Sequence, residues 1–167
     1  MGQVFQVVDL KDERNLALKT LSVSFAKEDE IFRRFVDEAQ ICSKLEHEHI
    51  VAVQGFDLDH EPPFLLMELI DGKSLRDLLD EGLNLKDSLD LIAQALEGLI
   101  FLHEKGILHR DIKPHNILVH EEKKALISDF GLAKAKEGSA VKTKTGLLVG
   151  TPAYLAPERI RGEKASR

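Results

Sequence analysis

The chain has 167 residues, of which 43% are hydrophobic and 31% charged, which is ordinary for one globular domain with its own core. Its formal net charge of −6 argues against an electrostatic nucleic-acid binder, because neutralising phosphates requires a basic surface. A single cysteine, Cys42, excludes an internal disulfide and fits a reducing compartment such as the cytoplasm, and no uninterrupted apolar stretch predicts a signal peptide or a membrane-spanning helix.

The first part of the chain shows short β-prone runs around one helical pattern. Strands are expected at residues 4–9, 15–20, 50–56 and 64–70. Between the second and third, residues 28–45 carry apolar side chains three and four positions apart, with acidic residues in the first turn. This pattern predicts an amphipathic helix whose dipole favours those acids. His47 and His49 alternate just after it, but a plain loop explains them better than a zinc site.

Asp71, Gly72 and Lys73 form the strongest break near the middle. We expect residues 71–73 to be a hinge between a sheet-rich region, 1–70, and a helical region, 74–167. Ser74 is a suitable N-cap for a short helix, and a longer helix is expected from about residue 86 to 103. Two short strands, 117–119 and 125–128, should follow.

Four short motifs stand in a recognisable order. His109–Asn116 reads H-R-D-I-K-P-H-N, and Asp129–Gly131 reads D-F-G. Lys19 follows a leucine in an upstream strand, and Ala156–Glu158 reads A-P-E downstream. Together these residues resemble the Ser/Thr branch of the protein kinase superfamily, and specifically its eukaryotic-like bacterial members.

The resemblance implies an α+β, two-lobed protein kinase-like fold that is incomplete. Only Gly2 and Val4 match the end of the family's Gly-rich loop, so we expect the N-lobe to lack its first strand. The C-lobe is expected to end after the activation segment. Helices that the family places later would then be missing, which should leave part of the apolar surface of the 86–103 helix uncovered.

The catalytic roles that the resemblance implies fall on four residues. Asp111 would orient the substrate hydroxyl, and Lys113 would stabilise charge on the transferring phosphoryl group. Asn116 and Asp129 would bind Mg²⁺ through oxygen atoms, which this hard cation prefers. A lysine two positions after the catalytic aspartate is similar to Ser/Thr rather than tyrosine kinases.

The nucleotide site is also assigned by resemblance. Lys19 would contact the α- and β-phosphates and pair with Glu38 on the first helix, although each alone reads as an ordinary surface charge. Val4, Ala17 and Leu118 would enclose the adenine. Met67 would be the gatekeeper behind the base, and Glu68 and Leu69 would offer it backbone contacts. The stacked column that links the lobes in an active state is matched by Cys42, Val53, His109 and Phe130. These apolar positions are equally compatible with plain core packing.

Regulatory roles are implied within the activation segment, residues 129–158. Arg110 would pair with a phosphate there, and Thr143 and Thr145 are the candidate phosphosites, although they could equally be solvated loop residues. Thr151 would bond near Asp111 and shape the peptide groove, and Glu158 would anchor the end of the segment.

We therefore expect an ATP- and Mg²⁺-dependent Ser/Thr protein kinase that transfers the γ-phosphate to a protein hydroxyl. Its expected partners are ATP, a protein substrate, and an activating kinase or a second copy acting in trans, with no nucleic acid and no membrane segment in this chain. The alternative is a catalytically inactive, pseudokinase-like binding scaffold. A small-molecule phosphotransferase is disfavoured, because Gly150–Tyr154 and Ala156–Glu158 resemble peptide-groove features.

Overall fold

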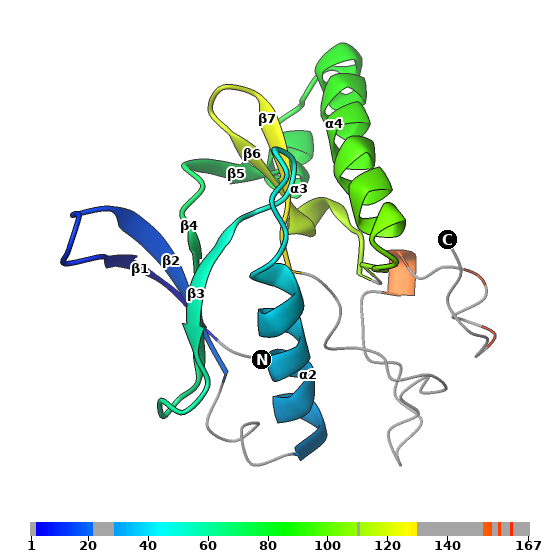
Figure 1. Cartoon of the computed structure of the whole chain (residues 1–167). Helices are drawn as coiled ribbons and strands as arrows, with labels where there is room; N and C mark the ends of the chain where they lie inside the picture. The colour runs from blue at the N-terminus through cyan, green and yellow to red at the C-terminus, as the bar shows by residue number, and fades with distance from the viewer. Residues whose placement is uncertain are drawn as a thin grey trace.

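Two antiparallel sheets organise the computed structural model, which describes residues 3–21, 29–109, 111–129, 152–154, 157 and 161 (Figure 1). The first sheet has the strand order β1-β2-β4-β3 and the second has the order β5-β6-β7. The strands of the first sheet are β1 (Val4–Val8), β2 (Asn15–Thr20), β3 (Val53–Asp57) and β4 (Phe64–Glu68). Those of the second are β5 (Gly72–Ser74), β6 (Ile117–His120) and β7 (Lys124–Ile127). The expected α+β class is confirmed.

One helix accompanies the first sheet and two the second. Helix α2 (Asp29–Cys42) buries Phe35 and Ala39 in a cluster with Leu65 of β4. Helices α3 (Leu75–Asp80) and α4 (Leu85–Glu104) belong to the second half, together with the single-turn helices η1 (Pro114–Asn116) and η3 (Pro152–Tyr154). In the described part of the chain, no helix is both long and apolar enough to cross a bilayer.

Local sequence signals account for the start of α3. The Ser74 side chain accepts a hydrogen bond from the backbone N–H of Asp77, and the Asp77 side chain accepts one from the backbone N–H of Ser74. This reciprocal capping box satisfies two backbone donors that the first helical turn leaves without partners. The predicted N-cap at Ser74 is therefore confirmed.

The hinge expected at residues 71–73 stays a prediction, but the structure shows how these residues are paired. Gly72 and Lys73 belong to strand β5, where they pair with His120 and Val119 of β6. A Cβ on Gly72 would lie 1.9 Å from the backbone oxygen of Val119. Gly72 therefore permits a close approach between two strands, and the connection between the sheets is residues 69–71.

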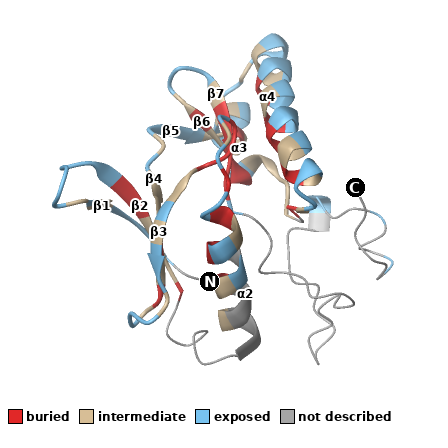
Figure 2. Ribbon diagram, in the orientation of Figure 1, coloured by how far each residue is buried: buried red, intermediate tan, exposed pale blue. Residues whose placement is uncertain are grey.

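Helix α4 is buried along one side, which faces the second sheet and, near its end, the connection after α2. Leu91, Ala95, Gly98 and Leu102 are buried, whereas a stripe on the other side is exposed (Figure 2). That stripe consists of Leu85, Leu89, Ile92, Leu96 and Ile100. The expectation that apolar surface of this helix is uncovered is confirmed.

Candidate active site

A buried histidine anchors the loop that precedes η1. His109 is 2% exposed, and its Nε2 lies 3.0 Å from the carbonyl oxygen of Ser128. A carbonyl can only accept, so Nε2 carries the hydrogen and donates it. The other ring nitrogen, Nδ1, accepts the backbone N–H of Asp111 at 3.3 Å. Burial lowers the pKa of the His109 imidazole below its usual range, which agrees with this neutral tautomer.

Three of the predicted catalytic side chains meet in the same loop. Lys113 Nζ donates to Asp111 Oδ2 at 3.0 Å. The side-chain Nδ2 of Asn116 donates to the backbone oxygen of Asp111 at 2.8 Å and to its Oδ2 at 3.2 Å. Asn116 is buried and lies in the single turn η1, which holds its amide in place. The Asp111 carboxylate is thus oriented by two donors from its own loop.

Backbone hydrogen bonds connect this loop to the segment that follows β7. The Ser128 N–H donates to the carbonyl oxygen of Asn116 at 2.9 Å, and the Ser128 hydroxyl donates to the same oxygen at 3.3 Å. Asp129 comes next, with a left-handed backbone φ of 55°. This conformation is uncommon outside glycine, asparagine and aspartate.

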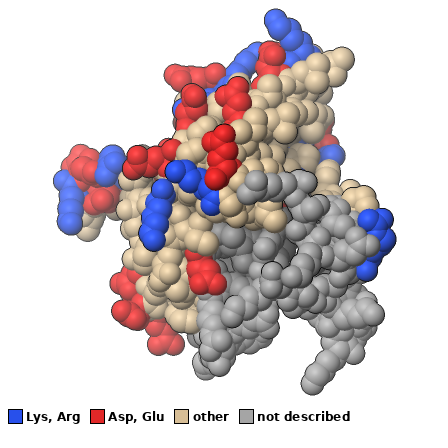
Figure 3. All heavy atoms as spheres, turned by 45° about the vertical axis from the view of Figure 1, so that its right-hand side comes forward, with Lys and Arg blue, Asp and Glu red and all other residues tan. Residues whose placement is uncertain are grey.

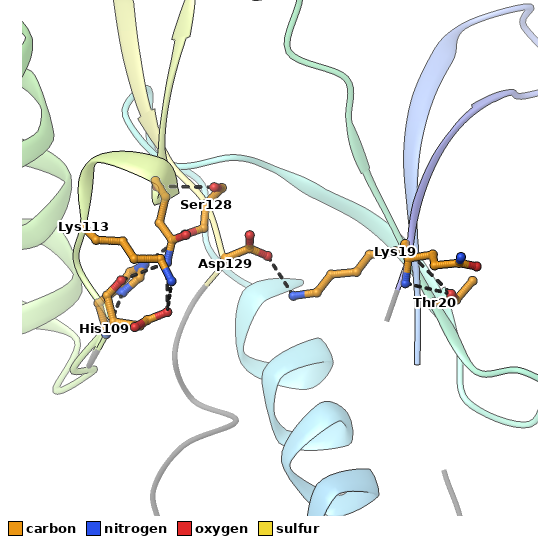
Figure 4. A network of polar contacts seen from close by, with 9 residues as sticks. Lys19, Thr20, His109, Lys113, Ser128 and Asp129 are labelled. Carbon is orange, nitrogen blue, oxygen red and sulfur yellow. Dashed lines mark hydrogen bonds and ion pairs between the residues drawn. The ribbon is translucent and has the colours of Figure 1, made fainter. Parts of the chain in front are cut away.

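Asp129 then reaches across to the first sheet. Its Oδ1 lies 2.9 Å from Lys19 Nζ, on β2 (Figure 4). The two residues are 110 positions apart in the sequence, and β2 lies inside its sheet between β1 and β4. The structure therefore brings Lys19 and Asp129 together and joins them, through Ser128, to Asp111, Lys113 and Asn116.

The residues expected around the adenine lie on both sheets. Ala17 of β2 pairs with Met67 of β4, and Val4 of β1 pairs with Lys19. Leu118 lies on β6 and pairs with Ser74, at the start of the second half. Val4 and Ala17 are therefore next to Lys19 on the first sheet, whereas Leu118 lies on the second. Val4 is 62% exposed.

Of the backbone groups predicted to contact the base, at Glu68 and Leu69, the N–H of Glu68 already has a hydrogen-bond partner within the protein. Glu68 N–H donates to Ala52 O at 3.0 Å, and the Glu68 carboxylate accepts the Ala52 N–H at 3.0 Å. A base contact at Glu68 would therefore have to use its carbonyl oxygen. Leu69 begins the connection between the sheets and is 36% exposed.

Several predicted residues fall outside the described part of the chain. Glu38 belongs to α2, but its side chain is among those not described. The predicted regulatory positions that lie outside the described residues are Arg110, Thr143, Thr145, Thr151 and Glu158. Their roles stay predictions.

A cavity of about 550 Å³ lies elsewhere, between β5, β6, α3 and the first turns of α4. Its lining includes the apolar Leu78, Leu83 and Leu91. It also includes Asp87 and Lys123, which pair at 2.8 Å. None of the residues expected to contact ATP lines it. Acidic and basic side chains are interspersed on the described surface in view, without one dominant sign (Figure 3).

Comparison with known proteins decides the family. The family model described as "Protein kinase domain" matches residues 1–167. The chain belongs to the protein kinase family. As a kinase domain it is 36% identical to the serine/threonine-protein kinase PknA of Mycobacterium tuberculosis over 99% of this chain, and 37% identical to PknB of Mycolicibacterium smegmatis over 98%. It spans only 40% and 27% of those two relatives.

A solved kinase structure supports the same fold. The crystal structure of Rad53 residues 1–466 in complex with AMP-PNP superposes with a TM-score of 0.75 at 30% identity, covering 96% of this chain and 39% of that one. The expected resemblance to bacterial Ser/Thr kinases and the partial kinase fold are therefore confirmed.

Sequence reasoning missed one residue that positions the candidate active site. Ser128 supplies an N–H, a hydroxyl and a carbonyl oxygen that bond Asn116 and His109. A serine at the end of a β-strand carries no motif of its own. Only its place immediately before Asp129 could have drawn attention to it.

Proposed function

We propose that this chain carries the ATP-binding and phosphoryl-transfer machinery of a Ser/Thr protein kinase. The observation that supports this best is the 2.9 Å contact between Lys19 and Asp129 in one network with Asp111, Lys113 and Asn116. In this network, the ammonium groups of Lys19 and Lys113 can bind phosphates, and the oxygen atoms of Asn116 and Asp129 can bind a cation. The carboxylate of Asp111 can bind the hydroxyl of a substrate. Phosphoryl transfer depends mainly on such positioning and electrostatic stabilisation.

The donor set fits Mg²⁺. Because Asn116 directs its Nδ2 toward Asp111, its Oδ1 points away, and no described residue donates a hydrogen bond to that oxygen. Asp129 uses Oδ1 for Lys19, which leaves Oδ2 as a second oxygen ligand. Carboxylate and amide oxygens suit this cation. When bound, Mg²⁺ supplies positive charge that neutralises the phosphate oxygens.

The protein side chains would then act in sequence on one reaction. Lys19 would hold the α- and β-phosphates, and Asp111 would orient the serine or threonine hydroxyl and accept its proton. The bond between the γ-phosphorus and the β-γ bridging oxygen breaks as the bond to the hydroxyl oxygen forms, and ADP leaves. Lys113, 3.0 Å from Asp111, would stabilise the negative charge of the phosphoryl group during this transfer.

Adenine binding is proposed at the junction of the sheets. Ala17, Met67 and Leu118 would contact the base, with Val4 above it and the connection at Leu69 along its edge. Their supporting observation is the strand register, which puts Ala17 directly opposite Met67. The single cysteine of the sequence, Cys42, which is buried, fits work in the cytoplasm.

Regulation is proposed through the activation segment. Phosphate on Thr143 or Thr145 would pair with Arg110, placed there by an activating kinase or by a second copy in trans. Thr151 would shape the groove for a protein substrate, and Glu158 would fix the end of the segment. Hydrogen bonds to charged groups contribute about 1.5–3 kcal/mol each, which is enough for one phosphate to order a loop.

Transfer of radiolabelled γ-phosphate to a generic basic protein tests the proposal. The purified chain with ATP and Mg²⁺ should label the substrate on serine or threonine, and Asp111→Asn should lower the rate by about 10²–10⁴-fold. Asp90→Asn is the matched control, because Asp90 is an exposed aspartate of α4 away from the site. Nucleotide binding with no transfer, unchanged by Asp111→Asn, would favour the binding-scaffold alternative instead.

A further inference from the structure

A histidine and two glutamates meet where the connection between α2 and β3 touches α4. His49 is 6% exposed, whereas Glu48 and Glu97 are exposed beside it. The ligand atoms of the three side chains all lie within 4.8 Å of one another. The cluster is separate from the candidate active site, since it shares no residue or hydrogen bond with the Lys19–Asp129 network among the described contacts.

The main chain and the ring of His49 are both held by strand β7. The His49 carbonyl oxygen accepts the backbone N–H of Ile127 at 2.9 Å, and Nδ1 lies 2.9 Å from the carbonyl oxygen of Ala125. Helix α4 lies close by because it has no side chain at Gly98, where a Cβ would come within 2.8 Å of the His49 oxygen. This contact fixes Glu97, the preceding residue, next to the imidazole.

The tautomer of His49 leaves a reactive lone pair. The Ala125 carbonyl can only accept a hydrogen bond, so Nδ1 carries the hydrogen, and in the neutral ring Nε2 presents a bare lone pair. Nε2 lies 3.5 Å from Glu97 Oε2. A lone pair and a carboxylate oxygen repel each other, so a cation between them, or a second proton on the ring, is needed to make this contact favourable.

We propose that Glu48, His49 and Glu97 bind a divalent borderline transition-metal ion, with Zn²⁺ as the best match. Zinc–nitrogen and zinc–oxygen bonds of about 2.0–2.2 Å place two ligand atoms of a tetrahedral ion about 3.4 Å apart. The separation of His49 Nε2 from Glu97 Oε2 is already 3.5 Å. Rotation of the exposed Glu48 side chain would complete three ligands, and water would occupy the fourth position.

Two further features fit a metal rather than a simple ion pair. Metal-binding histidines usually donate their second ring hydrogen to a carbonyl or carboxylate, as Nδ1 does to Ala125 O. Two carboxylates balance the charge of a divalent cation, and an imidazole nitrogen favours Zn²⁺ or Co²⁺ over Mg²⁺, which prefers oxygen ligands alone. The bound ion would fasten residues 47–49 to α4.

Calorimetric titration of the EDTA-treated, dialysed chain with Zn²⁺ tests this proposal. We expect one Zn²⁺ per chain at this site, with affinity at least tenfold lower in Glu48→Gln and in Glu97→Gln. Glu46→Gln should bind as the unaltered chain does, because Glu46 is an exposed glutamate of the same connection outside the cluster. These variants keep His49, whose replacement could disturb folding.

Absorption spectra with Co²⁺ provide the second measurement. Ligand-field bands typical of mixed nitrogen and oxygen coordination should appear with one equivalent of Co²⁺ and disappear in Glu97→Gln. Two results would overturn the proposal. One is the absence of stoichiometric Zn²⁺ binding, together with an NMR spectrum that shows Nε2 of His49 protonated at neutral pH. The other is binding that survives both glutamine variants but is lost in Asp129→Asn, which would assign the ion to the candidate active site.

Discussion

Leu102 and Leu96 provide a test of how α4 is packed. Both are leucines of the same helix, but Leu102 is 0% exposed and Leu96 is 52% exposed. Changing either to alanine removes the same atoms and leaves helix propensity nearly unchanged. Leu102 lies in a cluster with Cys42, Leu45 and Ile50, so its truncation leaves a cavity between α4 and the connection after α2.

The magnitudes separate clearly. Truncation of a buried leucine costs about 2–5 kcal/mol of unfolding free energy, whereas surface changes usually stay within about 0.5 kcal/mol. Since 1 kcal/mol shifts the melting temperature of a chain of this length by about 2–4 °C, Leu102→Ala should lower it by about 4–20 °C. Leu96→Ala should shift it by no more than about 2 °C. Circular dichroism during heating measures both, and equal shifts, or a larger one for Leu96→Ala, would refute the packing described for α4.

Three more predictions concern the site and its scaffold. Because burial lowers the pKa of folded His109 below the 6.5 of an exposed histidine, the unfolded chain takes up a proton first as the pH falls through 6.5. The unfolding free energy, measured with urea, should therefore fall as the pH is lowered from 6.5 to the pKa of folded His109. It should fall less steeply in His109→Phe, and an identical dependence on pH in both chains would contradict this. Gly72→Ala should destabilise the chain by at least about 1–3 kcal/mol, since its Cβ would meet a backbone oxygen at 1.9 Å. Gly55→Ala meets nothing within 4 Å and should be close to neutral, so the same denaturation assay compares the two. Lys19→Met should severely weaken ATP binding and phosphoryl transfer. It should change the unfolding free energy by only about 0–1 kcal/mol, because the pair with Asp129 is partly exposed. Nucleotide titration and melting curves measure these two effects, and retained ATP affinity would contradict the proposed role.

Local signals in the sequence predicted the elements that local physics determines. Strands β1 and β2 follow from the β-prone runs at residues 4–9 and 15–20, and the start of α3 follows from Ser74 as its N-cap. Helix α2 begins at Asp29 and ends at Cys42, close to the predicted 28–45. Helix ends are set by capping and by tertiary contacts, which a periodic pattern specifies only to within a few residues.

Long-range contacts were beyond such signals. Gly72 looked like a chain break because glycine often ends an element, but its place in β5 depends on the approach of β6, more than 40 residues later. The family resemblance predicted Glu38 as the partner of Lys19, and the contact of Lys19 with Asp129 at 2.9 Å was not predicted. Nothing in either local sequence specifies the other. The sequence alone disfavoured zinc near His47 and His49, because Glu97, which completes the cluster at His49, comes from a different element.

Strand β7 explains why these distant groups stay aligned. It accepts the chain from β6, pairs in parallel with Ile50 through backbone bonds at 2.9 and 3.0 Å, and leads directly to Ser128 and Asp129. Each buried backbone hydrogen bond contributes about 0.5–1.5 kcal/mol, and leaving one unmade costs more, whereas the partly exposed pair of Lys19 with Asp129 contributes at most about 1 kcal/mol. The position of Asp129 is therefore determined mainly by the backbone of β7 and by the hydrogen bonds of Ser128 to Asn116, and Lys19 adjusts to it. A metal ion at His49 would act on the same strand, through Ala125, and would stabilise the frame on which the candidate active site is built.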